Sequence, residues 1–480
     1  MRQPHPLRRL MIALPVLAAL TMPCALTAQA GKSRGDLPDA PRVGLVLLAD
    51  AAQSAPGAAM QAPTSAAQPA NGPRLTRREA EDMAIRNNPR ISVSRLLALA
   101  SHQVVREARS AELPTAAGAL TGVKAEDASR ISAGSLTASR LFTHAGAGGA
   151  FTQLITDFGR TTNLVSSSKL QEKAQNANAL ATTEDIVLAT DQAFYNALQA
   201  QALLQVAQQN TSTLSTTQTQ VNQMTTNKLK STLDLSIANV NLSQAKLLEL
   251  DAENNRDSTM AALDAVLGLD HTVTYDLMGA DNPLRPPPAD SDPLVQLALQ
   301  QRPDLQALNY AQQAAVKFSK AERDQKLPTI SAMGTAGGTP IRPDGTYYLT
   351  NWWGGVGVNV NVPIFNGFLY SAQEQEARLR AQADAEQSRD LRDSIVRDVR
   401  TAWLAAQTAY QKVGVSEELL KQANLALGLA QTRYKLGLSS IVELSQTQYQ
   451  QIDAAIGNTN AQYQYRLALA TLNYQIGATP

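Results

Sequence analysis

Residues 203–224 read LLQVAQQNTSTLSTTQTQVNQM, and this stretch decides the fold class. Apolar, small and neutral polar residues recur in it at alternating steps of four and three, the spacing of the seam between packed helices. The seam positions are Leu203, Ala207, Asn210, Leu214, Thr217, Val221 and Met224. The stretch lies within residues 160–267, which contain no glycine and no proline. At ~1.5 Å per residue, a helix over residues 162–226 would be about 100 Å long. The pattern therefore predicts long coiled-coil helices.

The chain repeats one pattern twice. Residues match at an offset of 214 near the start of each copy and at an offset of 209 further on. The pairs at 209 include Ile155 and Ile364, Ile186 and Ile395, Ser231 and Ser440, Leu235 and Leu444, and Gly268 and Gly477. We predict a first repeat over residues 74–280, a proline-rich linker over 281–291 and a second repeat over 292–480. Each copy is expected to hold a helix of about 35 residues (76–111 and 292–325), two strands and a long helical hairpin.

The strands carry a separate signal. Between residues 355 and 364, apolar and polar or small side chains alternate, and two tryptophans precede the run. The apolar positions are Val356, Val358, Val360, Val362 and Ile364, and the tryptophans are Trp352 and Trp353. About ten such residues fit a strand of a transmembrane barrel with an interfacial aromatic girdle, although a half-buried strand of a soluble sandwich has the same pattern. Four strands cannot close a barrel around a pore, so a membrane role requires several chains.

The first 73 residues are expected to lie outside the fold. Residues 1–30 have arginines, a short apolar run and Ala28-Gln29-Ala30, which predicts a removed signal peptide. A retained anchor is the alternative, but the run is too short to span a membrane. Lipidation at Cys24, the single cysteine, is disfavoured by the preceding Pro23. Residues 31–73 are rich in alanine, proline, glutamine and serine, and we expect a disordered leader.

Composition excludes several classes of function. The net charge of +1 lacks the basic excess of a nucleic-acid-binding protein, and a single cysteine excludes a disulfide scaffold. The four histidines, His5, His102, His144 and His271, show no metal-ligand spacing with one another or with carboxylates. We therefore expect no enzyme, no metal and no cofactor. A secreted enzyme on a helical scaffold would need a convergent polar site that the sequence does not display.

Several motifs resemble those of the TolC-type outer-membrane efflux channel family, over about residues 74–480. They are Ala-x-x-x-x-Pro at Ala84 and Ala298, Leu-Pro at Leu113 and Leu327, Asp157-Phe158-Gly159-Arg160, Pro363-Ile364-Phe365-Asn366-Gly367, and RYKLGLSSIVEL over residues 433–444. The last is the most specific, since it looks like the family's tight turn between two long helices. Its counterpart over residues 228–235, KLKSTLDL, lacks the glycine, which leaves the shape of that turn open.

The resemblance implies a mainly helical protein with a small β part. Each protomer of a homotrimer would give four strands to one twelve-stranded barrel in the outer membrane of a Gram-negative-type bacterium, continued by a long periplasmic coiled-coil tunnel. The implied function is a passive exit channel for efflux or type I secretion, fed by an inner-membrane transporter through a periplasmic adaptor. The alternative is a soluble periplasmic coiled-coil adaptor or scaffold, which would have no use for lipid-facing strands.

The resemblance also assigns roles to residues at the turns. Glu443 would ring the pore constriction and favour cations, and Gln446 stands where the family can carry a second acidic residue. The alternative for Glu443 is a carboxylate that only stabilises a first helical turn. The residues expected to dock the adaptor are Lys230, Ser231, Asp234, Gly437, Ser439 and Ser440.

Overall fold

The computed structural model describes residues 73–125, 130–131, 139–140, 143–271, 273, 275–279, 284–341 and 352–478. All of them belong to one structural unit, residues 68–480. The expected signal peptide, nearly all of the expected leader, Cys24 and residues 281–283 of the expected linker lie outside the described residues.

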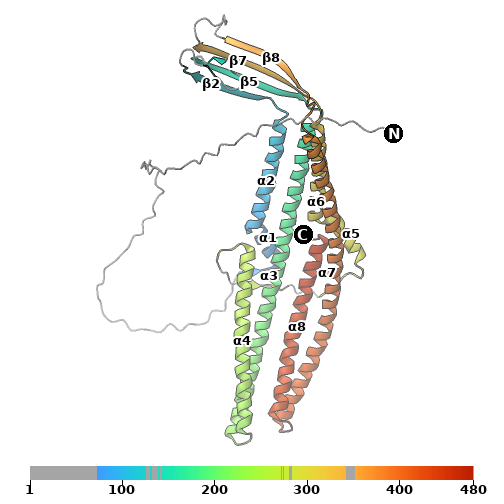
Figure 1. Ribbon diagram of the computed structural model, residues 1–480. Coiled ribbons are helices and arrows are strands. Elements are labelled where there is room, and N and C mark those ends of the chain that lie inside the picture. Colours follow the sequence, from blue (N-terminus) through green and yellow to red (C-terminus); the bar gives the residue numbers. More distant parts are fainter. Residues whose placement is uncertain are drawn as a thin grey trace, which may run out of the picture. The chain divides into compact units, whose positions relative to one another are not determined.

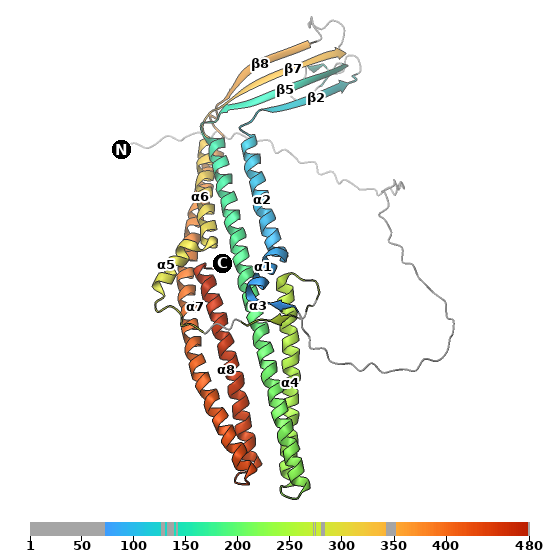
Figure 2. The same cartoon turned by 180° about the vertical axis from the view of Figure 1, so that it is seen from behind.

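Two long helical hairpins dominate the unit. The first consists of α3 (Arg160–Thr226) and α4 (Thr232–Leu267), and the second of α7 (Leu369–Lys435) and α8 (Ile441–Ile476). The paired helices have equal lengths, 67 residues for α3 and α7 and 36 residues for α4 and α8. Figures 1 and 2 show the hairpins side by side. These elements follow the 209-residue register read from the sequence, and the prediction of long helices is confirmed.

Each expected helix of about 35 residues is in fact two helices, so this prediction is wrong in detail. The first copy has α1 (Arg77–Asn87) and α2 (Pro89–Ser110), and the second has α5 (Asp292–Gln301) and α6 (Pro303–Asp324). Proline opens the second helix of each pair, and the residue before it, Asn88 or Arg302, is extended.

The caps of these helices differ between the copies. In the first copy, Thr76 caps α1 in a capping box with Glu79. In the second copy, Ser291 holds the cap position of α5 and Asp292 is the first helical residue.

Each break between two short helices lies against the glycine that follows the last helix of a hairpin. Gly268 and Gly477, both in the left-handed region, follow the last turns of α4 and α8. A Cβ added to Gly268 would lie 2.8 Å from the Asn87 carbonyl oxygen, and one added to Gly477 would lie 3.2 Å from the Arg302 nitrogen. Asn88 also donates from Nδ2 to the Val266 oxygen at 2.9 Å. The α1–α2 break therefore packs against the end of α4, and the α5–α6 break packs against the end of α8.

The four long strands form one antiparallel sheet. They are β2 (Thr115–Val123), β5 (His144–Thr156), β7 (Thr329–Ile341) and β8 (Trp352–Asn361), in the order β2-β5-β7-β8. The predicted strand 355–364 is shifted, because β8 starts at Trp352 and stops before Val362 and Pro363, which lacks an amide donor. Within the described residues, no strand pairs with the outer edge of β2 or β8.

Tight turns connect the sheet to the long helices. Asp157 is buried and accepts the Thr161 amide of α3 on Oδ2 at 2.7 Å. Two consecutive residues have positive φ at each junction, Phe158 and Gly159 before α3, and Gly367 and Phe368 before α7. The sheet therefore lies at one end of the helices and the hairpin turns at the other, as Figure 1 shows.

Two short strand pairs were not predicted. β1 (Arg74–Leu75) pairs in parallel with β6 (Asp276–Leu277), and β3 (Arg130–Ile131) pairs with β4 (Ser139–Arg140) in antiparallel orientation. Two-residue strands are too short to leave a periodic pattern. The first pair attaches the start of the fold to the segment that follows α4.

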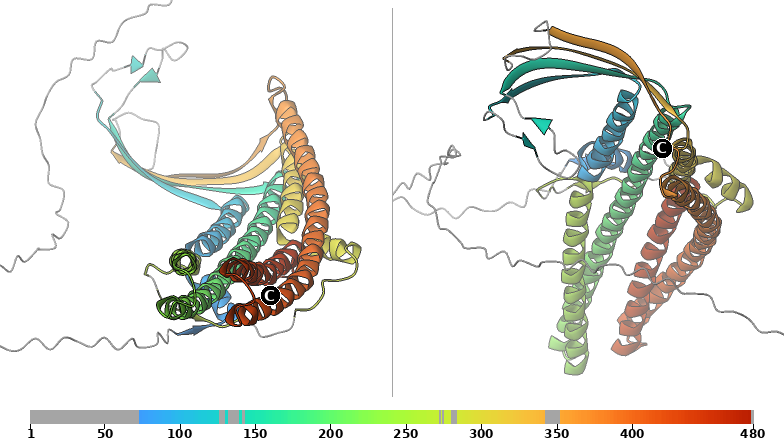
Figure 3. Two further views of the ribbon diagram at one scale, coloured as in Figure 1. Left: turned by 90° about the horizontal axis from the view of Figure 1, so that it is seen from below. Right: turned by 45° about the horizontal axis from the view of Figure 1, so that its top comes forward.

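The core is thin and built largely from small residues. Ala80, Ala84, Ala197, Ala298 and Ala314 are completely buried, whereas Tyr465 and Phe194 are the largest buried side chains. Alanine lets helix axes approach closely. Figure 3 shows the hairpins arranged next to each other and not around a common centre. Among the described helices, none is both long and apolar enough to cross a membrane.

Candidate functional site at the hairpin turns

The two hairpins reverse direction through the same hydrogen-bond pattern. In the first, the Leu229 amide donates to the Met224 oxygen at 2.8 Å and the Lys228 amide to Thr225 at 3.0 Å. In the second, Leu438 donates to Arg433 at 2.8 Å and Gly437 to Tyr434 at 3.1 Å. Both are Schellman motifs, which satisfy the last carbonyls of a helix. We call residues 224–235 and 433–446 together the tip site.

The missing glycine of the first turn is replaced by a strained lysine. Gly437 has φ +75° and Lys228, at the position 209 residues earlier, has φ +60°. A residue with a Cβ pays about 1–2 kcal/mol for this conformation. The first turn therefore has the same shape as the second, which answers the question that the sequence left open.

A serine begins the returning helix of each hairpin. Ser231 Oγ accepts the Asp234 amide at 3.2 Å, and Ser440 Oγ accepts the Glu443 amide at 3.3 Å. Asp234 and Glu443 thus lie in the first turns of α4 and α8, where a carboxylate is stabilised by the helix dipole. This geometry agrees with the helix-stabilising interpretation of Glu443, and Asp234 occupies the same position in the first hairpin. Both side chains are partly exposed.

Glu443 is paired, which the sequence analysis missed. Its Oε1 lies 3.3 Å from Arg433 Nη1, and 39% of its side chain is exposed. The two residues flank the turn at equal distances from Leu438, so the reversal of the chain brings them together. Gln446 is exposed one turn further along α8. A carboxylate ring at this level would therefore be partly neutralised by arginines.

The two turns also contact each other. Lys230 Nζ lies 4.4 Å from the centre of the Tyr434 ring, a cation–π contact from the first turn to the end of α7. Tyr434 is only 4% exposed, and burial together with the charge of Asp234 raises the pKa of its hydroxyl. Among the described residues, Tyr434 Oη and Ser439 Oγ are buried without a hydrogen-bond partner. A buried hydroxyl group without a partner costs free energy.

An apolar cluster lies under this contact and joins the hairpins. Its buried members are Val221, Ala238, Ala430, Tyr434, Ile441 and Leu444. Further from the turns the contacts between hairpins become polar. Asn241 Nδ2 donates to Ser445 Oγ at 2.7 Å, and Gln448 Nε2 donates to Thr217 Oγ1 at 3.3 Å.

The strand residues singled out from the sequence are exposed. Val356 is 95% exposed, and Val358, Val360, Val362 and Ile364 are also exposed. Trp352 is 78% exposed, while Trp353 is 48% exposed and lies across Gly337 and Gly148 of neighbouring strands. Within the described residues neither face of β8 is buried, whereas a strand of a soluble sandwich would have one buried face.

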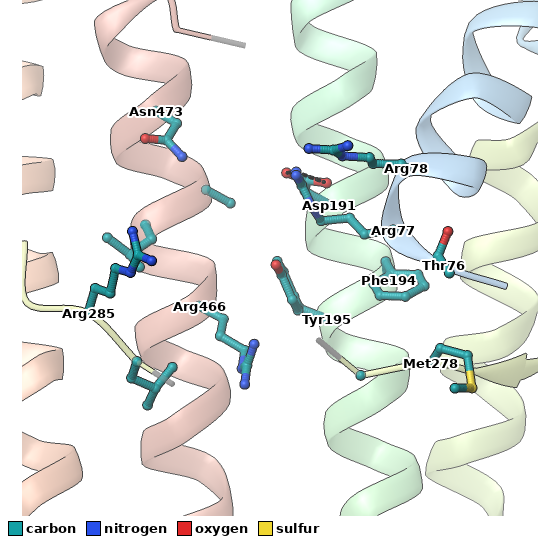
Figure 4. A pocket seen from close by; sticks show the side chains of 14 residues that line it. Thr76, Arg77, Arg78, Asp191, Phe194, Tyr195, Met278, Arg285, Arg466 and Asn473 are labelled. Atoms are coloured by element: carbon teal, nitrogen blue, oxygen red, sulfur yellow. Dashed lines mark hydrogen bonds and ion pairs between the residues drawn. The ribbon is translucent and has the colours of Figure 1, made fainter. Parts of the chain in front are cut away.

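A cavity halfway along the helices was not expected from the sequence. It has a volume of ≈ 910 Å³, and Figure 4 shows Arg77, Asp191 and Tyr195 on one wall, with Arg285, Arg466 and Asn473 on the other. Arg77 Nη1 lies 2.5 Å from Glu81 Oε1 and 3.0 Å from Asp191 Oδ2. Burial, followed by hydrogen bonding to Asp191, raises the pKa of Glu81 to about 7. This ion cluster fastens α1 to α3.

The described residues contain no group of three or more histidine, cysteine or acidic side chains that could hold a metal ion. His102 Nδ1 does approach Glu172 Oε1 at 2.8 Å, a pair formed across 70 residues that spacing could not reveal. Two ligands on an exposed surface do not make a metal site.

Two long hairpins and a four-stranded sheet give this chain the fold of solved outer-membrane channels. The family model described as "Outer membrane efflux protein" matches residues 294–478. The chain is 23% identical to outer membrane protein TolC of Escherichia coli K12 over 326 residues, covering 64% of this chain and 66% of that protein. It is 23% identical to the alkaline protease secretion protein AprF of Pseudomonas aeruginosa over 243 residues, covering 50% of each. These alignments span less than two thirds of either relative.

The fold of the Neisseria gonorrhoeae outer membrane channel MtrE, solved in its open state, is similar. The TM-score is 0.70 at 22% identity, with 85% of this chain and 89% of that chain covered. The chain therefore resembles outer-membrane efflux proteins over residues 294–478 and shares the fold of solved outer-membrane channels.

Proposed function

We propose that this protein is a trimeric outer-membrane exit channel of a tripartite efflux pump or a type I secretion system. The observation that carries the proposal is the sheet, whose edge strands β2 and β8 are exposed along nearly their whole length and lack partners at their outer edges among the described residues. The proposed channel carries out no reaction and needs no cofactor, because the transporter supplies the energy.

Insertion into a membrane would explain both the exposed edge strands and their outer edges without partners. Unpaired backbone groups are untenable in lipid, so the edge of β8 must pair with β2 of another copy. Three copies give twelve strands, with the exposed valines of β8 toward lipid and its asparagines toward the lumen. A soluble adaptor would leave this apolar surface in water, which disfavours the alternative function.

The helices offer matching surfaces to neighbouring copies. Leu233, Val240 and Leu247 of α4 are exposed at seven-residue spacing, and Val415, Leu419 and Leu429 are exposed on α7. Seven-residue apolar stripes are the contact surface of a coiled coil. Second copies of the chain would cover these stripes and close the helices into a tube.

The tip site is the proposed gate. The Lys230–Tyr434 contact and the apolar cluster below it hold the two hairpins together at the end away from the sheet. The Glu443–Arg433 pair joins the two helices of the second hairpin across their turn. Separation of the turns would widen the entrance, and it would also let water reach the buried Tyr434 and Ser439 hydroxyls. A periplasmic adaptor that binds Ser231, Gly437 and Ser440 on the exposed turns could stabilise the separated state.

Single-channel conductance of the detergent-purified protein in a planar bilayer tests this function. We expect discrete, cation-preferring steps. Glu443→Ala leaves Arg433 unpaired and should lower the cation preference on the order of two-fold or more, whereas Arg433→Ala should raise it. Glu417→Ala, an exposed carboxylate on α7 distant from the turn, is the matched control and should change neither. A purified protein that never conducts contradicts the channel, and unchanged selectivity in both tip variants contradicts only the constriction.

A further inference from the structure

The two tryptophans at the start of β8 lie on opposite faces of the sheet. Trp353 is paired with Gly337 of β7, and Gly337 is paired in turn with Gly148 of β5. Residues paired across a sheet share a face, whereas successive residues of one strand alternate between the two faces. Trp353 therefore shares a face with the two asparagines of β8, and Trp352 shares the other face with the valines of that strand.

The Trp353 indole lies along the surface of the sheet, across two neighbouring strands. A Cβ placed on Gly337 would overlap Cζ2 of this ring, and one placed on Gly148 would lie 3.0 Å from the same atom. The ring thus occupies the space that side chains at both positions would need. Because it points from β8 toward β5, away from the open edge of β8, pairing of that edge with another copy would leave the ring uncovered.

The surroundings of the indole on this face are small and uncharged. The side chains in its row and in the next row are no larger than threonine, and they belong to Ala119, Gly148, Gly337, Ala117, Ala150, Thr335 and Gly355. The four long strands contain no lysine, arginine, aspartate or glutamate. Since Trp353 is 48% exposed, one π face of a large ring is open to solvent among neighbours too small to cover it.

An open indole face is a binding surface for organic cations. The π electrons attract a positive charge within about 6 Å of the ring centre, and tryptophan does so better than tyrosine or phenylalanine. A small metal ion gains less from such a surface, because it needs oxygen ligands to replace its bound water. A quaternary nitrogen carries no such requirement. The chemistry of the site therefore favours quaternary organic cations.

We infer that Trp353 and its copies in the other two protomers line the lumen of the barrel and bind quaternary organic cations as these pass. We call these three side chains the exit ring. The inference rests on the proposed function, because the asparagine face becomes a lumen only when three copies close the barrel. β8 runs from Trp352 toward its junction with α7, so the exit ring lies at the end of the sheet away from the helices (Figure 1). Only Trp352 is then left for the lipid interface.

Fluorescence quenching of the trimer in lipid vesicles tests the two faces without requiring conduction. The double variants Trp352→Phe/Trp403→Phe and Trp353→Phe/Trp403→Phe each keep one tryptophan of β8 as the only fluorophore of its kind. Acrylamide in the water should quench Trp353 more strongly than Trp352, and lipids with brominated chains should quench Trp352 more strongly than Trp353. Equal quenching of the two residues, or the reverse order, overturns the assignment of Trp353 to the lumen.

Saturation-transfer NMR of the detergent-purified trimer tests the ligand. The probe is the cation 1-methylnicotinamide, and uncharged nicotinamide is the matched comparison, which should bind more weakly. Trp353→Leu should raise the Kd of the cation on the order of 5-fold, as expected for the loss of a cation–π contact in a hydrated site. Trp353→Phe should give an intermediate Kd. Trp352→Leu, the adjacent change on the opposite face, is the matched control and should leave the Kd unchanged.

A purely structural role of the indole gives a different result. An aromatic ring that covers glycines can stabilise a sheet without binding anything. If the Trp353→Leu trimer dissociates at a lower temperature but binds the cation with the wild-type Kd, the exit ring is overturned. Equal affinity of the wild type for the cation and for nicotinamide also overturns it. If the leucine variant does not assemble, Trp353→Phe keeps a ring over both glycines, and a wild-type Kd in that variant overturns the inference.

Conductance measured in parallel separates the two proposals. A protein that never conducts contradicts the channel, whatever the tryptophans bind. A conducting protein whose Kd for the cation does not depend on Trp353 contradicts only the exit ring.

Discussion

At the scale of single residues, strain and burial concentrate where the chain changes direction. Lys228 accepts the left-handed conformation that Gly437 adopts freely in the second hairpin. The Schellman bonds around it fix the turn, so the fold imposes this conformation on a residue that would otherwise avoid it. The sequence shows that the glycine of the motif is missing at this position. It does not show that the backbone adopts the same left-handed conformation without it.

Glu81 should make stability depend on pH. Its folded pKa of about 7 lies above the ordinary glutamate pKa of 4.5, so the folded state holds a proton that the unfolded state releases. The stabilisation is therefore complete below about pH 4.5 and is lost as pH rises through 7. Glu81→Gln, which cannot titrate, should flatten the melting temperature between pH 5 and 7.5. Asp82→Asn, a substitution at the exposed neighbouring residue, is the control. If Glu81→Gln leaves the slope of melting temperature against pH unchanged, the assignment to Glu81 is contradicted.

At the scale of elements, the ends of the long helices determine where the short helices break. Gly268→Ala should destabilise the protein by about 2–4 kcal/mol, because it adds a left-handed penalty to a clash with the Asn87 backbone. Gly437→Ala has the same φ of +75° but open space among the described residues, and should cost only about 1–2 kcal/mol. Denaturant unfolding of both variants measures the difference, and equal losses would show that the junction does not constrain Gly268.

Periodicity predicted the elements well and their junctions poorly. The seam over residues 203–224 and the alternation over 355–364 report local geometry, so the long helices and the strand were predictable. The breaks at Pro89 and Pro303 were not, since proline at a first helical position is compatible with either a kink or a new helix. In the tip site the motif located the turns, but the Lys230–Tyr434 contact joins residues from different hairpins, and only tertiary structure brings them together.

At the scale of the whole molecule, the two faces of β8 should respond differently to charge. Val358→Lys places a charge on the face assigned to lipid and should cost about 2–4 kcal/mol near the bilayer midplane. Asn359→Lys, the adjacent residue on the opposite face, is the matched control and should be tolerated. Outer-membrane fractionation with detergent-resistant trimers as the readout checks this. Equal insertion of both variants would contradict the assigned orientation of the strand.

The open edges of the sheet have a consequence for inheritance. In the proposed trimer, a protomer alone would leave the outer edges of β2 and β8 without the partners that they also lack among the described residues, so its stability would depend on the concentration of its copies. One altered subunit that still pairs at a single edge would prevent barrel closure in every trimer that contains it. Alleles that damage one edge strand should therefore be dominant over the wild-type gene, whereas alleles that prevent export should be recessive.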